Sequence, residues 1–324
     1  MNVQALEQLL GLLAGGQAHN GETLAQTLGM SRAAVWKKIE SLRELGLEVE
    51  GRAGTGYALT QPIERLDAAL IRSAMTDTAN AGLGKLRIAS VIDSTNSALR
   101  AESATLRSGT VLLAEAQTAG RGRRGRSWAS PFASGFLGSL FWRFERGLTD
   151  LGGLSLAVGV ALAEAWRAHG VPVQVKWPND LWIEDRKVAG MLVEAGGEFH
   201  GPSHVVVGLG LNLSLPESVR RTLDQPVTTL AEHWPQPMSR NAAVGCCLQA
   251  LHDALRAFEV DGLAAFAPRF AALDALRDRE VSVIEAHRTW RGIASGIDDR
   301  GRLRVRDASG VHAVDAADIS IKLD

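Results

Sequence analysis

A stretch of nine residues, 120–128 (GRGRRGRSW), carries four arginines and three glycines. Its first six residues match the G-x-G-x-x-G pattern of dinucleotide-binding loops, but in those loops the glycines open a helix. The residues after Gly125 contain Pro131 and show no 3.6-residue apolar period, so they do not predict a Rossmann fold. Arginine–glycine segments that bind single-stranded nucleic acid are usually repeated, whereas this one occurs once. Mobile glycines between guanidinium groups instead predict a loop that closes over a compact polyanion, such as a nucleoside triphosphate.

Two further polar motifs lie at the ends of predicted strands. The motif DSTN (93–96) directly follows the strand predicted over 85–92 and supplies small hydrogen-bonding side chains. The motif KWPNDLWIEDRKVAGMLVE (176–194) predicts a strand, a Pro-Asn-Asp turn, a second strand, and then Lys187 at the start of a third. The small residues after Lys187 leave this lysine space in a cleft. Either motif alone is also compatible with an ordinary turn or a surface lysine.

The elements that position these motifs follow from the apolar pattern in the middle of the chain. Strands are predicted over 85–92, 110–116, 135–142, 173–177 and 204–213, and helices near 96–104, 151–168 and 240–259. This mixture predicts one α/β domain of roughly two hundred residues. The segment GLGLNL (208–213) lacks the third glycine of a nucleotide-binding loop. Its glycines more simply allow another group to approach the backbone of a buried strand closely.

The first sixty residues predict a winged helix-turn-helix. Apolar stripes at helical spacing in 21–28 and 31–45, separated by Gly29, predict two helices and a tight turn. Two strand-like segments, 47–50 and 57–60, joined by the glycine-rich GRAGTG, predict the wing. The second helix is basic, which is typical of a recognition helix that faces DNA, although a packing module with solvated lysines is the alternative. The residues expected to contact DNA are Ser31, Arg32, Trp36, Lys37, Lys38 and Arg52.

Composition narrows the possible partners and environment. The formal net charge of −1 gives no overall field that attracts nucleic acid or a membrane, so anion binding must come from local clusters. The two cysteines, Cys246 and Cys247, are adjacent, which argues against a disulfide framework. No signal peptide is evident, and the apolar run 151–166 contains Glu164 and is too short to span a bilayer. We therefore expect a buried core helix there, and a cytoplasmic protein without a membrane partner.

Four motifs resemble, in order and spacing, those of the biotin–protein ligases: DSTN, QTAGRGRRGRSW, KWPNDLWIEDRKVAGMLVE and GLGLNL. With the amino-terminal winged helix, the resemblance extends to the bifunctional ligases that also repress the biotin operon. The segment RGIASGIDDRGRLRV (291–305) resembles the small terminal β domain of the same family. The resemblance implies an α+β multidomain protein. Its implied parts are a winged helix-turn-helix at 1–62, a central α/β ligase domain like the class II synthetases at 63–275, and a small SH3-like β-barrel at 276–324.

The resemblance also implies an ATP-dependent, AMP-forming reaction. The ligase joins the carboxylate of biotin to the α-phosphate of ATP, and the resulting biotinyl-5′-AMP acylates one lysine of a biotin carboxyl carrier protein. The residues implied at biotin are Ser94, Thr95, Asn96, Gln117, Arg121, Gly122, Arg123, Lys187, Gly208 and Gly210. Those implied at ATP or the adenylate are Arg121, Arg123, Arg124, Arg126, Trp128, Lys176, Asn179 and Asn212. Lys187, Arg121 and Arg123 are the implied catalytic residues, and Asp180 is the implied ligand of Mg²⁺.

The implied partners are the carrier domain of acetyl-CoA carboxylase, operator DNA of the biotin genes, and a second copy of the chain in a homodimer that biotinyl-adenylate promotes. Two departures from the repressor-type relative are visible. Ser127 stands where that relative has lysine, and Val227 is nearest to the position of the tryptophan that covers adenine, with Trp234 as an alternative cover. Two other functions remain open: a non-enzymatic DNA-binding regulator that only senses its ligand, and a lipoate-type acyl ligase. The arginine–glycine loop and Lys187 favour an enzyme, because a pure sensor needs no pyrophosphate leaving group.

Overall fold

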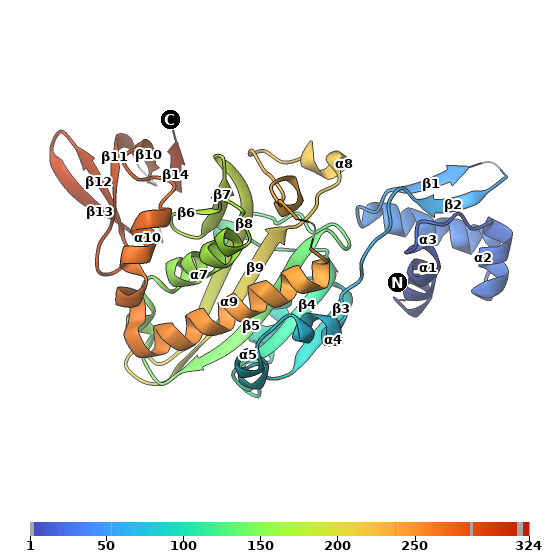
Figure 1. Ribbon diagram of the computed structural model, residues 1–324, viewed down its shortest axis with the longest axis horizontal. Helices are drawn as coiled ribbons and strands as arrows, with labels where there is room; N and C mark the ends of the chain where they lie inside the picture. The colour runs from blue at the N-terminus through green and yellow to red at the C-terminus, as the bar shows by residue number, and fades with distance from the viewer. Residues whose placement is uncertain (1–2, 53, 237, 286–287, 316–319, 324) are drawn as a thin grey trace.

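The computed structural model describes residues 3–52, 54–236, 238–285, 288–315 and 320–323. Three parts follow one another along the long axis of the molecule (Figure 1). A winged helix lies at the amino-terminal end, a seven-stranded sheet with its helices fills the middle, and a five-stranded sheet lies at the other end.

The amino-terminal part is a winged helix-turn-helix, as the sequence predicts. Its elements are the helices α1 (Val3–Leu13), α2 (Gly21–Thr27) and α3 (Arg32–Glu44) and the antiparallel wing strands β1 (Val49–Arg52) and β2 (Gly56–Leu59). Ser31 begins α3 because its hydroxyl accepts a hydrogen bond, at 3.2 Å, from the backbone N–H three residues further on. Gly29 turns the chain between α2 and α3 with φ of +61°, a left-handed conformation that glycine adopts without strain. Val35, Ile39 and Leu42 form the buried face of α3.

The middle of the molecule is a mixed sheet in the order β3-β4-β5-β9-β8-β7-β6. Its strands are β3 (Leu86–Ile92), β4 (Thr110–Gln117), β5 (Gly135–Phe144), β6 (Gln174–Lys176), β7 (Asp180–Ile183), β8 (Arg186–Gly197) and β9 (Ser203–Asn212). β3 and β4 run parallel with α6 (Thr95–Ala101) between them, and the other neighbours are antiparallel. All five predicted strands form. The sheet is mostly antiparallel because short turns, rather than crossover helices, join β6 to β9.

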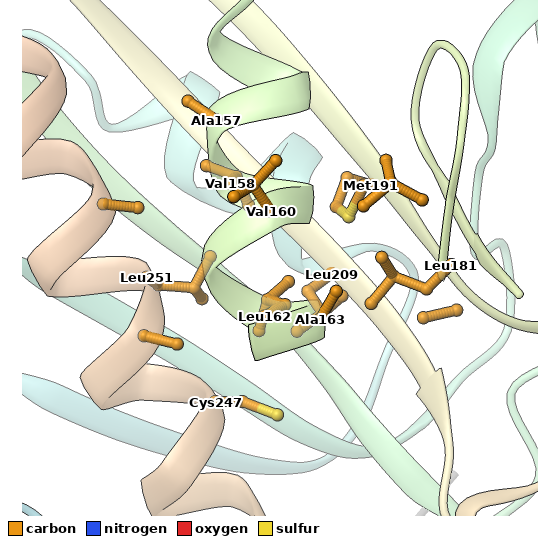
Figure 2. Close-up of a cluster of buried hydrophobic side chains, with 14 of the residues drawn as sticks. Ala157, Val158, Val160, Leu162, Ala163, Leu181, Met191, Leu209, Cys247 and Leu251 are labelled. Atoms are coloured by element: carbon orange, nitrogen blue, oxygen red, sulfur yellow. The ribbon is translucent and has the colours of Figure 1, made fainter. Parts of the chain in front are cut away.

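Two long helices, α7 (Leu154–Ala168) and α9 (Arg240–Asp261), pack on the sheet and on each other. In Figure 2, Ala157 and Leu162 of α7 lie in one apolar cluster with Leu251 of α9 and Leu209 of β9. The segment that ends in α7 is long and apolar enough to cross a membrane by composition, but most of the side chains of α7 are buried in this core. The prediction of a buried core helix is therefore confirmed. The remaining helices are α4 (Ala68–Ser73), α5 (Asp77–Gly82), α8 (Glu217–Arg220), α10 (Ala267–Leu273) and the short 3₁₀ turns η1 (Arg123–Gly125), η2 (Leu148–Leu151), η3 (Leu230–Glu232) and η4 (Gly262–Ala265).

The carboxyl-terminal part is a small antiparallel sheet in the order β13-β12-β11-β10-β14. Its strands are β10 (Glu280–Ile284), β11 (Thr289–Ile297), β12 (Leu303–Asp307), β13 (Gly310–Val314) and β14 (Ser320–Leu323). Alternate residues of these strands, such as Val281, Val283, Leu303 and Val305, are buried, which is the pattern of a sheet with one covered face. The small β domain is thus confirmed, with β13 and β14 at the two ends of the strand order.

Residues 120–128 are called the arginine segment below. The loop that follows this segment anchors the winged helix to the sheet. The Phe132 N–H donates to the Leu45 carbonyl at 2.8 Å, and Phe132 belongs to the same apolar cluster as Leu42. Gly46, with φ of +86°, faces Pro131 so closely that a β-carbon at position 46 would lie 2.6 Å from the Pro131 β-carbon. The chain that leaves the arginine segment therefore packs directly into the winged helix.

The linker between the winged helix and the sheet is held by buried polar side chains. Glu115 and Arg240 form an ion pair, and each also binds the linker backbone. The Leu66 N–H donates to Glu115 Oε1 at 2.7 Å, and Arg240 Nη1 donates to the Glu64 carbonyl at 3.0 Å. Asn241 Nδ2 donates to Glu64 Oε1 at 2.6 Å. Because buried polar groups are costly without partners, these contacts fix the path of the linker.

Candidate active site

Most of the predicted ligand residues line one cleft on the central sheet. The space between the walls of the cleft, part of it open to solvent, is about 710 Å³. Its walls come from the start of α6, the end of β4, the arginine segment, the turn between β6 and β7, and strands β8 and β9. The lining residues are Ser94, Thr95, Asn96, Gln117, Arg121, Gly122, Arg123, Arg126, Ser127, Trp128, Gly138, Asn179, Asp180, Lys187, Gly190, Met191, Leu192, Gly208, Leu209, Gly210 and Gln225.

The floor of the cleft begins where α6 follows β3. Ser94 caps α6, since its hydroxyl accepts the Ser97 N–H at 3.3 Å. This cap turns Thr95 into the first turn of the helix, where its N–H donates to Gln117 Oε1 at 2.8 Å. Gln117 is the last residue of β4, the parallel neighbour of β3, so the ends of two adjacent strands place these side chains together.

A buried hydrogen-bond network continues from Thr95 under the cleft. The hydroxyls of Thr95 and Ser139 lie 2.7 Å apart, and Ser139 Oγ donates to Asn96 Oδ1 at 2.5 Å. Asn96 Nδ2 in turn donates to Glu194 Oε2 at 2.9 Å, and Arg100 forms an ion pair with the other oxygen of that carboxylate. Every polar side chain in this row has a partner, so the floor is a preorganised polar surface.

Two glycines of β9 leave room for these side chains. A β-carbon at Gly208 would lie 2.2 Å from Asn96 Oδ1, and one at Gly210 would lie 2.4 Å from the Trp128 ring. The resemblance implies that both glycines let the backbone approach a ligand closely. In the structure they also leave room for two side chains of the protein itself, and a β-carbon at either position would force a shift.

We predict that Gly208→Ala lowers the affinity for biotin, the ligand that the resemblance implies, at least tenfold. The added methyl displaces Asn96 and breaks its buried hydrogen bonds, each worth about 1 kcal/mol or more, so a loss of roughly 10- to 100-fold follows. Calorimetric titration with biotin measures this. Gly11→Ala, which adds the same methyl in open space on α1, is the control and keeps wild-type affinity. Equal affinities for the two variants would show that the Asn96 network is not needed for binding.

Four cationic side chains line the cleft: those of Lys187, Arg121, Arg123 and Arg126. Lys187 Nζ lies 2.9 Å from Asp180 Oδ1 and 5.4 Å from the centre of the Trp128 ring, within the range of a cation–π contact. Arg123 Nη1 donates to Asn179 Oδ1 at 3.1 Å, and Arg121 Nη2 donates to a serine hydroxyl of α6 at 2.5 Å. Burial lowers the pKa of Arg123, while the negative charge of Asp180 opposes that shift. This is the arrangement expected where an anion binds.

The Pro-Asn-Asp turn is rigidly placed. Asn179 Nδ2 donates to the Met191 carbonyl at 2.6 Å, and the Met191 N–H donates to the Asn179 carbonyl at 2.9 Å. The Pro178 carbonyl, after a cis Trp177–Pro178 peptide bond, accepts from Ser155 Oγ of α7 at 3.0 Å. The Trp177 indole N–H donates to the Gly301 carbonyl of the small β domain at 2.9 Å. Contacts from β8, from α7 and from the small β domain therefore fix this turn, which carries Asn179 and Asp180, the partners of Arg123 and Lys187.

Three residues predicted at the adenylate lie outside the cleft lining. Lys176 Nζ lies over the Trp182 ring at 4.3 Å, and Asn212 is buried with its Nδ2 donating to the Thr228 carbonyl at 3.2 Å. Arg124 has φ of +58° in the short turn η1 and also lies outside the lining set. Their contacts with a nucleotide stay predictions.

The segment expected to cover adenine is pinned beside Lys187. The Lys187 N–H donates to the Pro226 carbonyl at 3.0 Å, and the Thr228 N–H donates to the Lys187 carbonyl at 2.9 Å. Val227 is buried between them, and Gln225 lines the cleft. Trp234 instead packs edge-on against a tryptophan of α7, with ring centres 5.2 Å apart, and does not line this cleft. The suggestion that Trp234 covers the nucleotide is therefore not supported.

Several lining residues are not among the ligand residues predicted from the sequence. They are Ser127, Gly138, Gly190, Met191, Leu192, Leu209 and Gln225, with Ser139 beneath the floor. Gly190, Met191 and Leu192 belong to the same motif as Lys187 and follow it on β8. Their position in this motif could have indicated that they line the cleft. Ser139 and Gln225 had none, because strand pairing and loop packing alone bring them to the cleft.

The residues predicted to contact DNA lie on α3, at its N-terminal cap and in the wing. Arg32, Trp36 and Lys37 are exposed on α3, with 52% of Trp36 accessible, and Lys38 is half-buried. Arg32 and Trp36 line a surface groove with Tyr57 and the glycines of the wing. Ser31 acts as the helix cap. Arg52 ends β1 by its backbone, and its side chain lies outside the described residues.

Three sequence families match the chain in the order of its structural parts. They are an HTH domain at residues 5–58, the biotin/lipoate A/B protein ligase family at 88–212, and the biotin protein ligase C-terminal domain at 278–322. A winged helix joined to a ligase domain with a cationic cleft defines the class: a ligase that carries its own DNA-binding domain. The chain belongs to the biotin–protein ligase family, in its bifunctional ligase and repressor form.

Individual relatives support this assignment along nearly the whole chain. The bifunctional ligase/repressor BirA of Escherichia coli (strain K12) is 41% identical over 91% of this chain and 90% of its own length. The biotin–[acetyl-CoA-carboxylase] ligase of Paracoccus denitrificans is 33% identical over 70% of this chain and 96% of its own length. Biotin protein ligase from Aquifex aeolicus, solved in complex with biotin and ATP, is 24% identical, with a TM-score of 0.63 over 75% of this chain and all of that one. This last likeness shows a shared fold.

Proposed function

We propose that the cleft binds biotin and ATP, forms biotinyl-5′-AMP, and transfers biotin to a lysine of a biotin carboxyl carrier protein. The observation that carries this proposal is the convergence of Lys187, Arg121, Arg123 and Arg126 on one cleft with a buried polar floor. A carboxylate and a triphosphate both need cations, and the floor offers hydrogen bonds to the polar ureido end of biotin. The apolar part of biotin would lie against Met191, Leu192 and Leu209.

The first chemical step brings two anions together, so charge neutralisation and alignment matter more than a general base. A carboxylate oxygen of biotin attacks the α-phosphorus of ATP, the bond from that phosphorus to the bridging oxygen breaks, and pyrophosphate leaves with the electron pair. Lys187 would hold the attacking carboxylate and the developing charge on the α-phosphate. Arg121, Arg123 and Arg126 would neutralise the phosphates from the loop above. In the second step, the neutral amine of the carrier lysine attacks the acyl carbon, AMP leaves, and an amide bond remains.

Mg²⁺ would enter the cleft with ATP, where the ion supplies charge neutralisation on the phosphates. The described residues contain no cluster of three His, Cys, Asp or Glu side chains that could hold a metal by themselves. Asp180 is the sole carboxylate among the described lining residues. This donor set fits an ion held mainly by phosphates and water, with Asp180 as its one protein ligand.

A biotinylation assay tests the proposal directly. Avidin blotting of a purified carrier domain, after incubation with the protein, biotin and ATP, is expected to show label, with one pyrophosphate released for each biotin activated. Biotin binding without pyrophosphate release would favour a non-enzymatic sensor. Preferential activation of lipoate over biotin in a competition assay would favour the related acyl ligase.

The second proposed activity is repression of biotin genes by a homodimer that biotinyl-adenylate promotes. The observations that support it are the exposed basic face of α3 and the wing beside it. A two-fold dimer presents two recognition helices to paired half-sites, which is the geometry of a palindromic operator. We further propose that the protein is cytoplasmic and has no membrane partner; the burial of α7 in the core supports the absence of a membrane-spanning role for this helix. We propose domain boundaries near residues 62 and 275, where the linker and the chain after α10 pass between the three parts.

We predict that Arg32→Ala weakens binding to the biotin-gene operator about tenfold and lowers the slope of log affinity against log salt by about one per bound winged helix. Arg32 lies at the exposed start of α3. Without its phosphate contact, binding of the variant to DNA releases fewer counterions. Gel shifts over a salt series with biotin and ATP measure this. Arg256→Ala, which removes an exposed arginine from α9, is the control. An equal loss in both variants would assign the effect to overall charge rather than to α3.

A further inference from the structure

The cleft contains a carboxylate of the protein, Asp180, beside Lys187, the lysine that is proposed to bind the carboxylate of biotin. Asp180 Oδ1 lies 2.9 Å from Lys187 Nζ, and the two side chains expose only 15% and 12% of their surfaces. No other carboxylate occurs among the described residues that line the cleft. An ammonium group this far from water needs a counter-ion or hydrogen-bond acceptors, and Asp180 supplies both.

One hairpin sets this pair. Asp180 is the first residue of β7 and pairs with Gly190 of β8, while Lys187 lies three residues earlier on β8. The turn before Asp180 is fixed by the two hydrogen bonds between Asn179 and Met191. The backbone therefore places the carboxylate and the ammonium group within reach of each other. A chance surface ion pair between two long, solvated side chains has no such support.

The substrate carboxylate and Asp180 compete for the same ammonium group. Two carboxylates that approach one cation in a partly buried site repel each other, and each weakens the other's interaction. We propose that Asp180 is the internal counter-ion of Lys187, which the carboxylate of biotin must displace, so that Asp180 limits the affinity of the protein for biotin alone. This inference rests on the proposed function of the cleft. In the protein without ATP, Asp180 would position Lys187. This role is separate from the binding of Mg²⁺ that is proposed for Asp180 when ATP is present.

The test compares biotin with biotinol, the analogue whose carboxylate is replaced by a neutral alcohol. In Asp180→Asn, the side chain keeps its size and can still accept a hydrogen bond from Lys187, but its charge is gone. We expect biotin to bind roughly three- to tenfold more tightly to Asp180→Asn than to the wild-type chain, and biotinol to bind both equally. Calorimetric titration of the full-length protein, without ATP, measures both ligands.

Two variants separate the local charge from other effects. Asp180→Glu keeps the negative charge and should show no gain in biotin affinity. Asp185→Asn removes a charge from the same hairpin, where Asp185 is paired with Arg279 at 2.5 Å on the exposed side, and should leave both affinities unchanged. Thermal melting checks that each variant is folded. If Asp180→Asn does not fold, Asp180→Ser provides the same comparison.

The outcomes distinguish this inference from the function on which it rests. Unchanged or weaker biotin binding in the neutral variants, or an equal change for biotin and biotinol, overturns the counter-ion role but leaves the ligase proposal intact. Wild-type protein that binds neither ligand overturns the proposed function, and the inference with it. Tighter biotin binding with unchanged biotinol binding supports both.

Discussion

Lys187→Ala is expected to lower the rate of biotin ligation by a factor of about 10² to 10³, the usual cost of removing one preorganised donor from a charged transition state. Lys187 is the one lysine among the described residues that line the cleft, and its ammonium faces the space between the arginine segment and the Pro-Asn-Asp turn. Initial rates of pyrophosphate release, at saturating biotin and ATP, measure the effect.

The control for this prediction is Lys85→Ala. Lys85 is exposed just before β3 and lies outside the cleft lining, so its loss should leave the rate within twofold of the wild type. The winged helix of Lys187→Ala should remain folded and should bind DNA non-specifically as before, because its apolar core, built from α1, α2, α3 and the wing together with Phe132, does not include Lys187. Ligation at the wild-type rate in Lys187→Ala would remove Lys187 from the catalytic site.

Arg240→Ala is expected to destabilise the protein by about 3–5 kcal/mol, the cost of leaving a buried charge without its partner. Glu115 is fully buried, and Arg240 is its hydrogen-bonded charge partner, while Arg65 Nε lies further away, 3.9 Å from Glu115 Oε1. The same guanidinium donates to the Gly135 carbonyl at 3.2 and 3.1 Å and to the Glu64 carbonyl at 3.0 Å. The substitution therefore removes the close charge partner of one buried carboxylate and a donor to two backbone carbonyls. Urea unfolding followed by tryptophan fluorescence measures the change in free energy.

Arg269→Ala is the matched control. Its ion pair with Glu164 is about 40% exposed, so solvent and salt screen it, and its loss should cost no more than about 1 kcal/mol. Replacing Glu115 and Arg240 together by Leu and Met should recover much of the lost stability, because no charge then remains buried. If Arg240→Ala costs as little as the control, the linker is held by other contacts, such as those of Asn241.

The winged helix could be predicted from sequence because its determinants are local. Ser31 caps α3, Gly29 supplies the left-handed turn, and the apolar period of α3 gives its buried face, all within fifteen residues. The central strands were predicted for the same reason. Their mostly antiparallel order was not predicted, because neighbours in a sheet depend on pairings between segments far apart in the chain.

The sequence predicts which motifs contribute to the cleft, but not how their residues are arranged in space. Motif residues at the start of α6, the end of β4 and the arginine segment line it together, since strand ends in one sheet meet at a common edge. Ser139 and Gln225 were missed because neither lies in a motif, and β5 and the loop after β9 carry them to the site. Lys176 belongs to one of the motifs and is predicted at the adenylate. Its ammonium group instead lies over the Trp182 ring, and Lys176 is not among the residues that line the cleft.

The sequence by itself determined which chemical groups this protein possesses: a basic helix with a wing, an arginine loop, a strand-end cluster of small polar residues, and one lysine beside small residues. The tertiary structure decided which of these groups neutralise each other. Glu115 meets Arg240 across 125 residues of chain, and the hairpin sets Asp180 against Lys187. The physical reason is that the interaction of two charges depends on their separation and burial, and a sequence motif specifies neither of these.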